Sequence, residues 1–134
     1  MDPSAGIGTG VYVPAGGAAW LTASHSSYKE NLEQVDGSEI LDKLSQLDIK
    51  RWNYKSQDES VAHISPLAED FYELFNVGDN DHTISTIDPS GVALAAIKEL
   101  HKKTIELEKQ NERMDDLEEK IAKLEKLIEK MSDK

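Results

Sequence analysis

Cysteine is absent from this 134-residue sequence, and aromatic residues are scarce, with two tryptophans and two phenylalanines. The lack of cysteine excludes disulfides and thiolate chemistry, and it leaves the redox compartment open. Hydrophobic residues make up 38% of the chain, which allows one modest domain with a thin core. We therefore expect part of the chain to be elongated and to bury its apolar surface against other copies of itself.

Positive charge is also scarce, because 15 Lys and Arg residues face 26 Asp and Glu residues, giving a net charge of -11. A protein that binds duplex nucleic acid needs a basic face, and binding to anionic membranes needs basic clusters. The sequence has no apolar run long enough to span a membrane, and its start lacks the features of a signal peptide. We expect neither a nucleic-acid nor a membrane partner.

Three segments of different composition follow one another, and together they predict an α+β fold. Residues 1–23 contain five of the eight glycines and one charged residue, Asp2. The β-prone run 10–13 predicts a short strand in a narrow β stem, the end of an upstream fibre segment. Residues 24–91 are predicted to form a globular domain, and residues 92–134 a long helix.

The middle segment mixes helical and β patterns. Residues 38–47, after a breaker at 36–37, carry an apolar stripe of helical spacing formed by Ile40, Leu41, Leu44 and Leu47. The β-prone runs 49–54 and 61–64 flank a polar turn, which predicts a hairpin.

Helix boundaries can also be predicted from residue types in the second half of this segment. Ser65, followed by proline, predicts an N-cap for a helix that runs through Phe75. Residues 78–81 are a polar turn, and a long helix is predicted from Asp88 onward.

The long helix contains no glycine or proline over residues 92–131, and its apolar residues follow heptads. One frame places Leu100, Leu107, Met114, Ile121 and Ile128 at a, and Leu117, Leu124 and Met131 at d. In the first half a shifted frame fits about as well, with Ile97, Leu100, Thr104, Leu107 and Asn111 in the seam. We expect the helix to dock on its own domain and then to enter a coiled coil.

Charged residues beside the seam favour parallel association. A basic residue at a g position of one helix would face an acidic residue at an e position of its neighbour: Arg113 would face Glu118, and Lys120 would face Glu125. Isoleucine at a with leucine at d is typical of two strands. A polar seam residue, Gln110 or Asn111, fits two strands or three, so the heptads alone leave the number open.

Ser24 and Lys29 stand where the glycine-rich segment ends, directly after the small residue Ala23. A hydroxyl beside an amine forms a nucleophile and a general base, provided that the amine is neutral. A solvated lysine is protonated near neutral pH, whereas burial favours the neutral form.

Five motifs occur in order along about residues 10–110. They are Gly16-Gly17-Ala-Ala-Trp20, Ser24 with Lys29, Trp52-Asn-Tyr54, His63-Ile-Ser-Pro-Leu-Ala-Glu-Asp-Phe71 and Asp88-Pro-Ser-Gly-Val-Ala-Leu-Ala-Ala-Ile97. Together they resemble the S74 peptidase family, the self-cleaving intramolecular chaperone domains at the C-termini of phage tailspikes, tail fibres and related bacterial surface proteins.

The resemblance implies a homotrimer whose C-terminal helices form a parallel coiled coil, and a chaperone role toward the upstream fibre or spike segment of the same polypeptide. By position, Ser24 would attack the carbonyl of Ala23 with Lys29 as general base, which would cleave the chain before Ser24. No cofactor or metal is implied. The implied location is a virion tail fibre or spike, or a bacterial cell surface, with the chaperone part released after assembly.

Three positions depart from the family pattern: His25 replaces Asp, Ser27 replaces Arg or Asn, and Ser65 replaces Gly. A lost Asp could remove a group that orients the pair, so a permanent trimerisation cap that never cleaves is the alternative function. A generic coiled-coil adaptor is a third hypothesis, against which the ordered motifs count.

Other motifs are weaker. Ser26 with Lys29 also fits the Ser-x-x-Lys signature of penicillin-recognising proteins, but their further motifs are missing. The four histidines lie too far apart for a local metal motif, and His63 is interpreted as structural. Residues 79–81 resemble part of a calcium loop without its closing Glu, and are interpreted as a turn.

Overall fold

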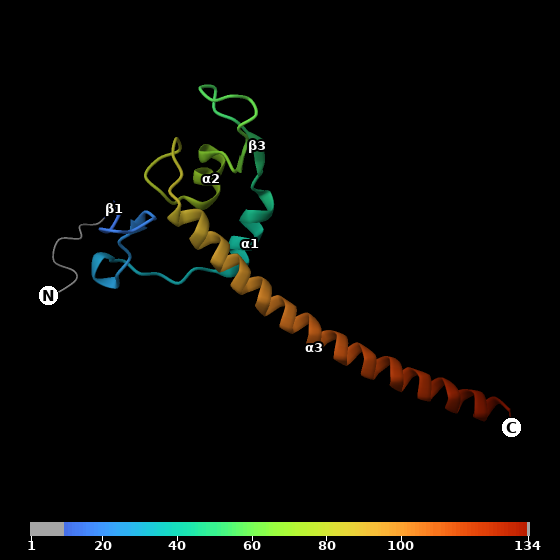
Figure 1. Cartoon of the computed structure of the whole chain (residues 1–134). Coiled ribbons are helices and arrows are strands. Elements are labelled where there is room, and N and C mark those ends of the chain that lie inside the picture. The colour runs from blue at the N-terminus through green and yellow to red at the C-terminus, as the bar shows by residue number, and fades with distance from the viewer. Residues whose placement is uncertain (1–9, 134) are drawn as a thin grey trace. The chain divides into compact units, whose positions relative to one another are not determined.

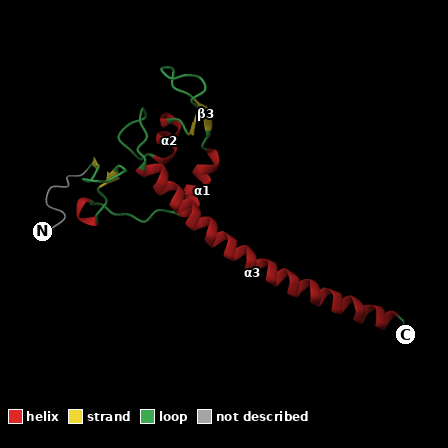
Figure 2. Cartoon of the chain, in the orientation of Figure 1, coloured by secondary structure: helices red, strands yellow, loops and turns green. Residues whose placement is uncertain are grey.

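The computed structural model describes residues 10–133, and it confirms the α+β fold class (Figures 1 and 2). The chain divides into two compact units, Met1–Gln34 and Val35–Lys134. Within residues 10–133, none of the helices combines the length and the apolar character that a membrane span needs.

The first unit contains a small antiparallel hairpin of β1 (Val11–Tyr12) and β2 (Leu21–Thr22). Its connecting turn includes Gly16 at φ +77°, a left-handed conformation that glycine adopts without strain. The strand expected at residues 10–13 is confirmed. Its partner β2 was not predicted, because two residues are too few to show the alternation that reveals a strand.

A short 3-10 helix, η1 (Ser26–Tyr28), follows the hairpin in the same unit. After it, Asn31 adopts a left-handed conformation at φ +52°, which asparagine tolerates better than most residues. The turn and this reversal lie on either side of Lys29.

The second unit is built from three helices around a small core: α1 (Gly37–Gln46), α2 (Ala68–Phe75) and α3 (Ile87–Ser132). The α1 helix contacts both of the others. The buried hydrophobic residues are Leu47, Phe71, Phe75, Val92 and Ala96. This short list agrees with the thin core expected from composition.

The first helix of this unit begins at Gly37, one residue before its predicted start at Ser38. The carboxylate of Asp36 accepts a hydrogen bond of 2.8 Å from the backbone N–H of Ser38, which caps the helix. Ile40 and Leu44 pack against the core, so the predicted apolar stripe does face inward.

The N-terminus of α1 rests on α3 at Glu99. A Cβ added at Gly37 would come within 2.8 Å of the Glu99 Cβ, so only glycine permits this approach. The hydroxyl of Ser38 donates to Glu99 Oε1 at 3.0 Å. These contacts fix the point at which α3 is attached to its own domain.

The predicted second hairpin is confirmed, with strands shorter than expected: β3 (Lys50–Trp52) pairs with β4 (His63–Ser65). The predicted N-cap at Ser65 is wrong. Helix α2 begins at Ala68, after Leu67, which makes no side-chain cap. The Ser65 hydroxyl instead accepts from Trp52 Nε1 at 3.0 Å and donates to the carbonyl of Pro66 at 2.9 Å. Ser65 is the last residue of β4, so its hydroxyl is engaged within the hairpin and does not cap α2.

The long helix α3 starts within one residue of its predicted position. The hydroxyl of Ser85 accepts from the N–H groups of Ile87 and Asp88, and it donates to the Asp88 carboxylate at 2.7 Å. Val92 and Ala96 enter the core. From residue 100 to residue 133 every residue is exposed, and Figure 1 shows this part of α3 extending beyond α1 and α2.

Candidate functional site

The side chains of Ser24 and Lys29 meet in the first unit. Lys29 Nζ donates a hydrogen bond to Ser24 Oγ, with 2.8 Å between the two atoms. Both residues are exposed to solvent in the single chain. The five-residue spacing therefore places an amine directly on a serine hydroxyl, which is the contact that a nucleophile and its general base require.

The 3-10 turn between Ser24 and Lys29 explains why a spacing of five residues brings their side chains together. Tyr28 N–H donates to the carbonyl of His25 at 3.1 Å, and Lys29 N–H donates to the carbonyl of Ser26 at 3.0 Å. His25 and Lys29 themselves are extended, with ψ near +147° and +146°. A tight turn flanked by extended residues reverses the chain, which brings the lysine side chain back toward Ser24.

The backbone just before Ser24 belongs to the hairpin. Ala23 N–H donates to the carbonyl of Gly10 at 3.0 Å, one step beyond the pairing of β1 with β2. The Ala23–Ser24 peptide bond therefore lies at the boundary between the hairpin and the 3-10 turn. A cut at this bond would leave both strands on the upstream side.

Two departures from the S74 pattern contact each other. His25 Nδ1 accepts from the backbone N–H of Ser27 at 3.2 Å, and it lies 2.8 Å from Ser27 Oγ. His25 is the N-cap of η1, a position at which Asp, Asn and Ser are the usual residues. Both residues were singled out from the sequence, but this contact was not predicted. It could have been expected because the His25 ring stands two residues before the Ser27 N–H, which needs an acceptor at the start of the turn.

Residues from two other motifs gather on the second hairpin. The rings of Trp52 and His63 have centroids 4.8 Å apart, and Tyr54 lies 5.5 Å from His63. His63 Nε2 is 3.0 Å from Gln57 Oε1 across the hairpin loop. These contacts give His63 a structural role.

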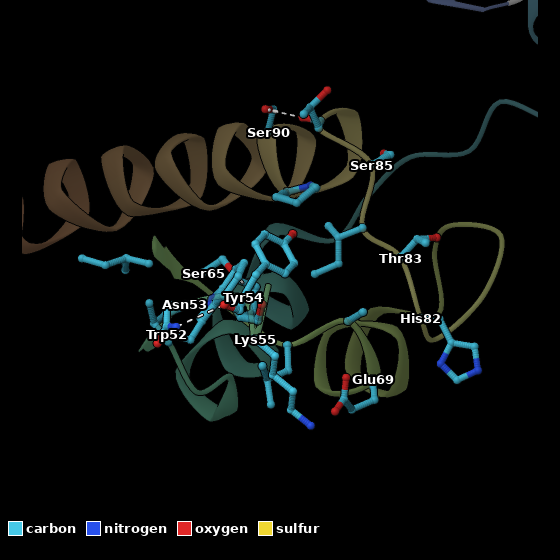
Figure 3. Close-up of a pocket in the computed structure, with 18 of the residues that line it drawn as sticks. Trp52, Asn53, Tyr54, Lys55, Ser65, Glu69, His82, Thr83, Ser85 and Ser90 are labelled. Atoms are coloured by element: carbon cyan, nitrogen blue, oxygen red, sulfur yellow. Dashed lines mark hydrogen bonds between the residues drawn. The ribbon is translucent and has the colours of Figure 1, made fainter. Parts of the chain in front are cut away.

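A half-open pocket of about 1240 Å³ lies beside this hairpin, bounded by the start of α2, residues 82–86 and the start of α3 (Figure 3). Trp52 and Tyr54 lie together on one side of it, and His82 lies at the far rim. Ser24 and Lys29 are not among its lining residues. The pocket brings together the hairpin and helix-entry motifs.

The polar turn at residues 78–81 is confirmed as a turn. Gly78 has φ +95°, and the side-chain carbonyl of Asn80 accepts from the N–H of His82 at 2.9 Å. Within residues 10–133, no three potential metal ligands form a cluster.

Two surface groups of the second unit have shifted pKa values with local causes. A hydrogen bond to Asp70 raises the pKa of Lys50, helped by the negative charges of Asp70 and Asp48. Hydrogen bonds from the hydroxyl and the backbone N–H of Ser60 lower the pKa of Asp58. Both shifts arise from side chains that join or terminate the second hairpin.

Comparison with known proteins supports the resemblance seen in the motifs. The family model Peptidase_S74, described as chaperone of endosialidase, matches residues 24–77. A search of curated proteins and a search of solved structures each found no match. The matched segment begins at Ser24 and includes Lys29, the second hairpin and α2. The similarity of this chain to the Peptidase_S74 family therefore lies in residues 24–77.

Proposed function

We propose that this chain is an intramolecular chaperone that assembles an upstream fibre or spike segment as a homotrimer and then releases itself by cleavage before Ser24. The observation that carries the proposal is the 2.8 Å hydrogen bond between Lys29 and Ser24 at the start of the family match. A virion tail fibre or spike, or a bacterial surface fibre, is the setting in which such a chaperone acts.

Exposed apolar surface on α3 supports association between copies. Seven large apolar residues remain more than half exposed in the single chain: Met114, Leu117, Ile121, Leu124, Leu127, Ile128 and Met131. Six of them occupy the a and d positions, and Leu127 occupies a g position. An apolar g residue widens the stripe beyond the narrow seam of a two-stranded coil, which favours three helices over two.

The cleavage reaction balances with groups of this chain and water. Neutral Lys29 removes the proton of Ser24 Oγ, which attacks the carbonyl carbon of Ala23. The C–N bond then breaks, the Ser24 nitrogen takes up the proton carried by the lysine, and an ester joins Ala23 to Ser24 Oγ. Water hydrolyses the ester, giving an Ala23 carboxylate and a new N-terminus at Ser24.

Assembly provides a way to switch this reaction on. The amine of Lys29 is exposed in the single chain, where water stabilises its protonated form. Covering the pair with neighbouring copies would favour the neutral amine, because burial disfavours the charged state. Cleavage would then report that a trimer has formed.

A permanent trimerisation cap is the second candidate, and the replacement of the family's Asp by His25 is the observation that favours it. The two candidates share the trimer and differ only in whether the Ala23–Ser24 bond is cut.

Variants at three positions test the assignment of the nucleophile and the base. Ser24→Ala and Lys29→Arg should each leave the chain intact, since arginine cannot give up its proton near neutral pH. Ser26→Ala is the matched control, because it removes a neighbouring hydroxyl from the same turn and should still cleave. Cleavage that survives Ser24→Ala but is lost in Ser26→Ala would move the nucleophile and refute the assignment.

A further inference from the structure

We infer that His25 is a positioning residue for the Ser24–Lys29 pair, and that it acts only while its imidazole is neutral. The inference rests on the proposed function for its effect on cleavage, whereas the contact itself can be tested without cleavage. It replaces the simpler expectation that losing the family's Asp removes the group that orients the pair.

The hydrogen bonds around His25 define the chemical state that it must have. Nδ1 accepts from the backbone N–H of Ser27 at 3.2 Å, so this nitrogen carries a lone pair. A neutral ring with its proton on Nε2 satisfies that requirement, and a doubly protonated ring does not. The Ser27 hydroxyl, 2.8 Å away, can direct its proton at the same lone pair.

This cap connects His25 to Lys29 through one turn of backbone. The N–H groups of Tyr28 and Lys29 close the turn onto the carbonyls of His25 and Ser26. The N–H of Ser27 has its partner in the His25 ring. Losing that partner leaves the start of the turn uncapped, and the turn determines where the lysine amine lies relative to Ser24.

Few charged groups surround the ring in this unit. The Tyr28 ring meets it edge-on, with centroids 6.2 Å apart. The other titratable residues of the described part of the unit are Tyr12, Lys29, Glu30 and Glu33. Protonation of Nδ1 would remove the acceptor of the Ser27 N–H, and with it the cap.

The direction of the pH effect follows from the two groups. Cleavage needs a deprotonated lysine, so the rate falls about tenfold per pH unit on the acid side for that reason alone. If His25 must also be deprotonated, the rate falls about a hundredfold per pH unit wherever both the lysine and the imidazole are protonated. A cleavage rate that depends on the loss of two protons, rather than one, would therefore identify the contribution of His25.

The first experiment measures the cap without cleavage. In the full chain carrying Ser24→Ala, long-range ¹H–¹⁵N NMR reports the protonation of each ring nitrogen, and the Ser27 amide is followed from pH 8 to pH 5. We expect the Nε2–H form of His25 and a Ser27 amide shift with the same midpoint as the ring. His101, exposed on α3, is the internal control whose titration should leave Ser27 unchanged. An Nδ1–H ring, or a Ser27 amide that ignores His25, would overturn the inference.

The second experiment compares cleavage by the parent, His25→Asn and His25→Ala. Asparagine offers a cap oxygen that does not titrate, so its profile should keep the single-proton slope down to pH 5 while the parent steepens. Alanine offers no acceptor and should cleave about tenfold more slowly than asparagine, the size of a typical lost cap. Parallel profiles for parent and asparagine would contradict the inference. Absence of cleavage in both would contradict the proposed self-cleavage, and the NMR titration would then decide the cap by itself.

Discussion

A single aspartate in the apolar seam of α3 should dissociate the proposed trimer. Ile121 occupies an a position and is 54% exposed in the single chain, so about half of its side chain is still available for burial by partners. That burial contributes about 1 kcal/mol per chain, half of the value for a fully buried isoleucine. In Ile121→Asp, three carboxylates would share one closed layer.

The magnitude is large compared with the stability of an assembly of this size. Each unpaired carboxylate taken out of water costs several kcal/mol, so the trimer loses about 10 kcal/mol or more when the lost isoleucine contacts are included. At about 1.4 kcal/mol per factor of ten, the equilibrium constant shifts by about seven orders of magnitude. Because the dissociation constant of a trimer scales with the square of concentration, the midpoint moves by about three and a half orders, so a trimer with a nanomolar midpoint would dissociate near micromolar concentration.

Sedimentation equilibrium at micromolar concentration measures this directly. With Ser24→Ala present in every sample to keep the chain uncut, the protein should show three times the 14.9 kDa mass of one chain, and Ile121→Asp should show the mass of one. Ala122→Asp is the matched control, because it adds the same charge to the next residue, at an exposed position outside the seam. A trimeric Ile121→Asp, or equal dissociation by Ala122→Asp, would refute the reasoning.

Three further predictions concern the folded domain. Phe71→Ala removes a core side chain that is 3% exposed and should lower the free energy of unfolding by about 3–5 kcal/mol in urea titrations, whereas Tyr72→Ala on the same helix, outside the buried core, should lower it less. Asp36→Ala removes the cap of α1 and should cost about 1 kcal/mol in the same titration, with most of that loss recovered in Asp36→Asn. Ser60→Ala should return the lowered pKa of Asp58 toward its ordinary value, as measured by carboxyl NMR. A lowered pKa adds to the stability of the fold at pH values above the ordinary pKa, and this contribution is lost as the pH falls through the folded pKa. The variant should therefore be less stable than the parent at neutral pH and equally stable in strong acid.

Features encoded by local pattern could be predicted from the sequence. The α1 stripe, the β3–β4 hairpin and the start of α3 depend on neighbouring residues, so spacing and capping residues were sufficient to place them. The long helix was predictable because nothing over residues 92–131 interrupts it.

Features encoded by partners distant in sequence could not be predicted in the same way. Ser65 has the right residue type for an N-cap, yet the Trp52 indole, 13 residues away, engages its hydroxyl. Strand β2 exists only because β1 pairs with it. At the junction, spacing indicated that Ser24 and Lys29 belong together, but the acceptor role of His25 depends on how its ring is turned, which a residue pattern does not specify.

Intact mass spectrometry of the folded protein, beside its Ser24→Ala counterpart, tests the central claim most directly. The account predicts two products from the parent, one ending at Ala23 and one beginning at Ser24, and a single intact chain from the variant. A parent that assembles as a trimer and keeps one intact mass between pH 5 and pH 9 would contradict self-release and leave a permanent cap.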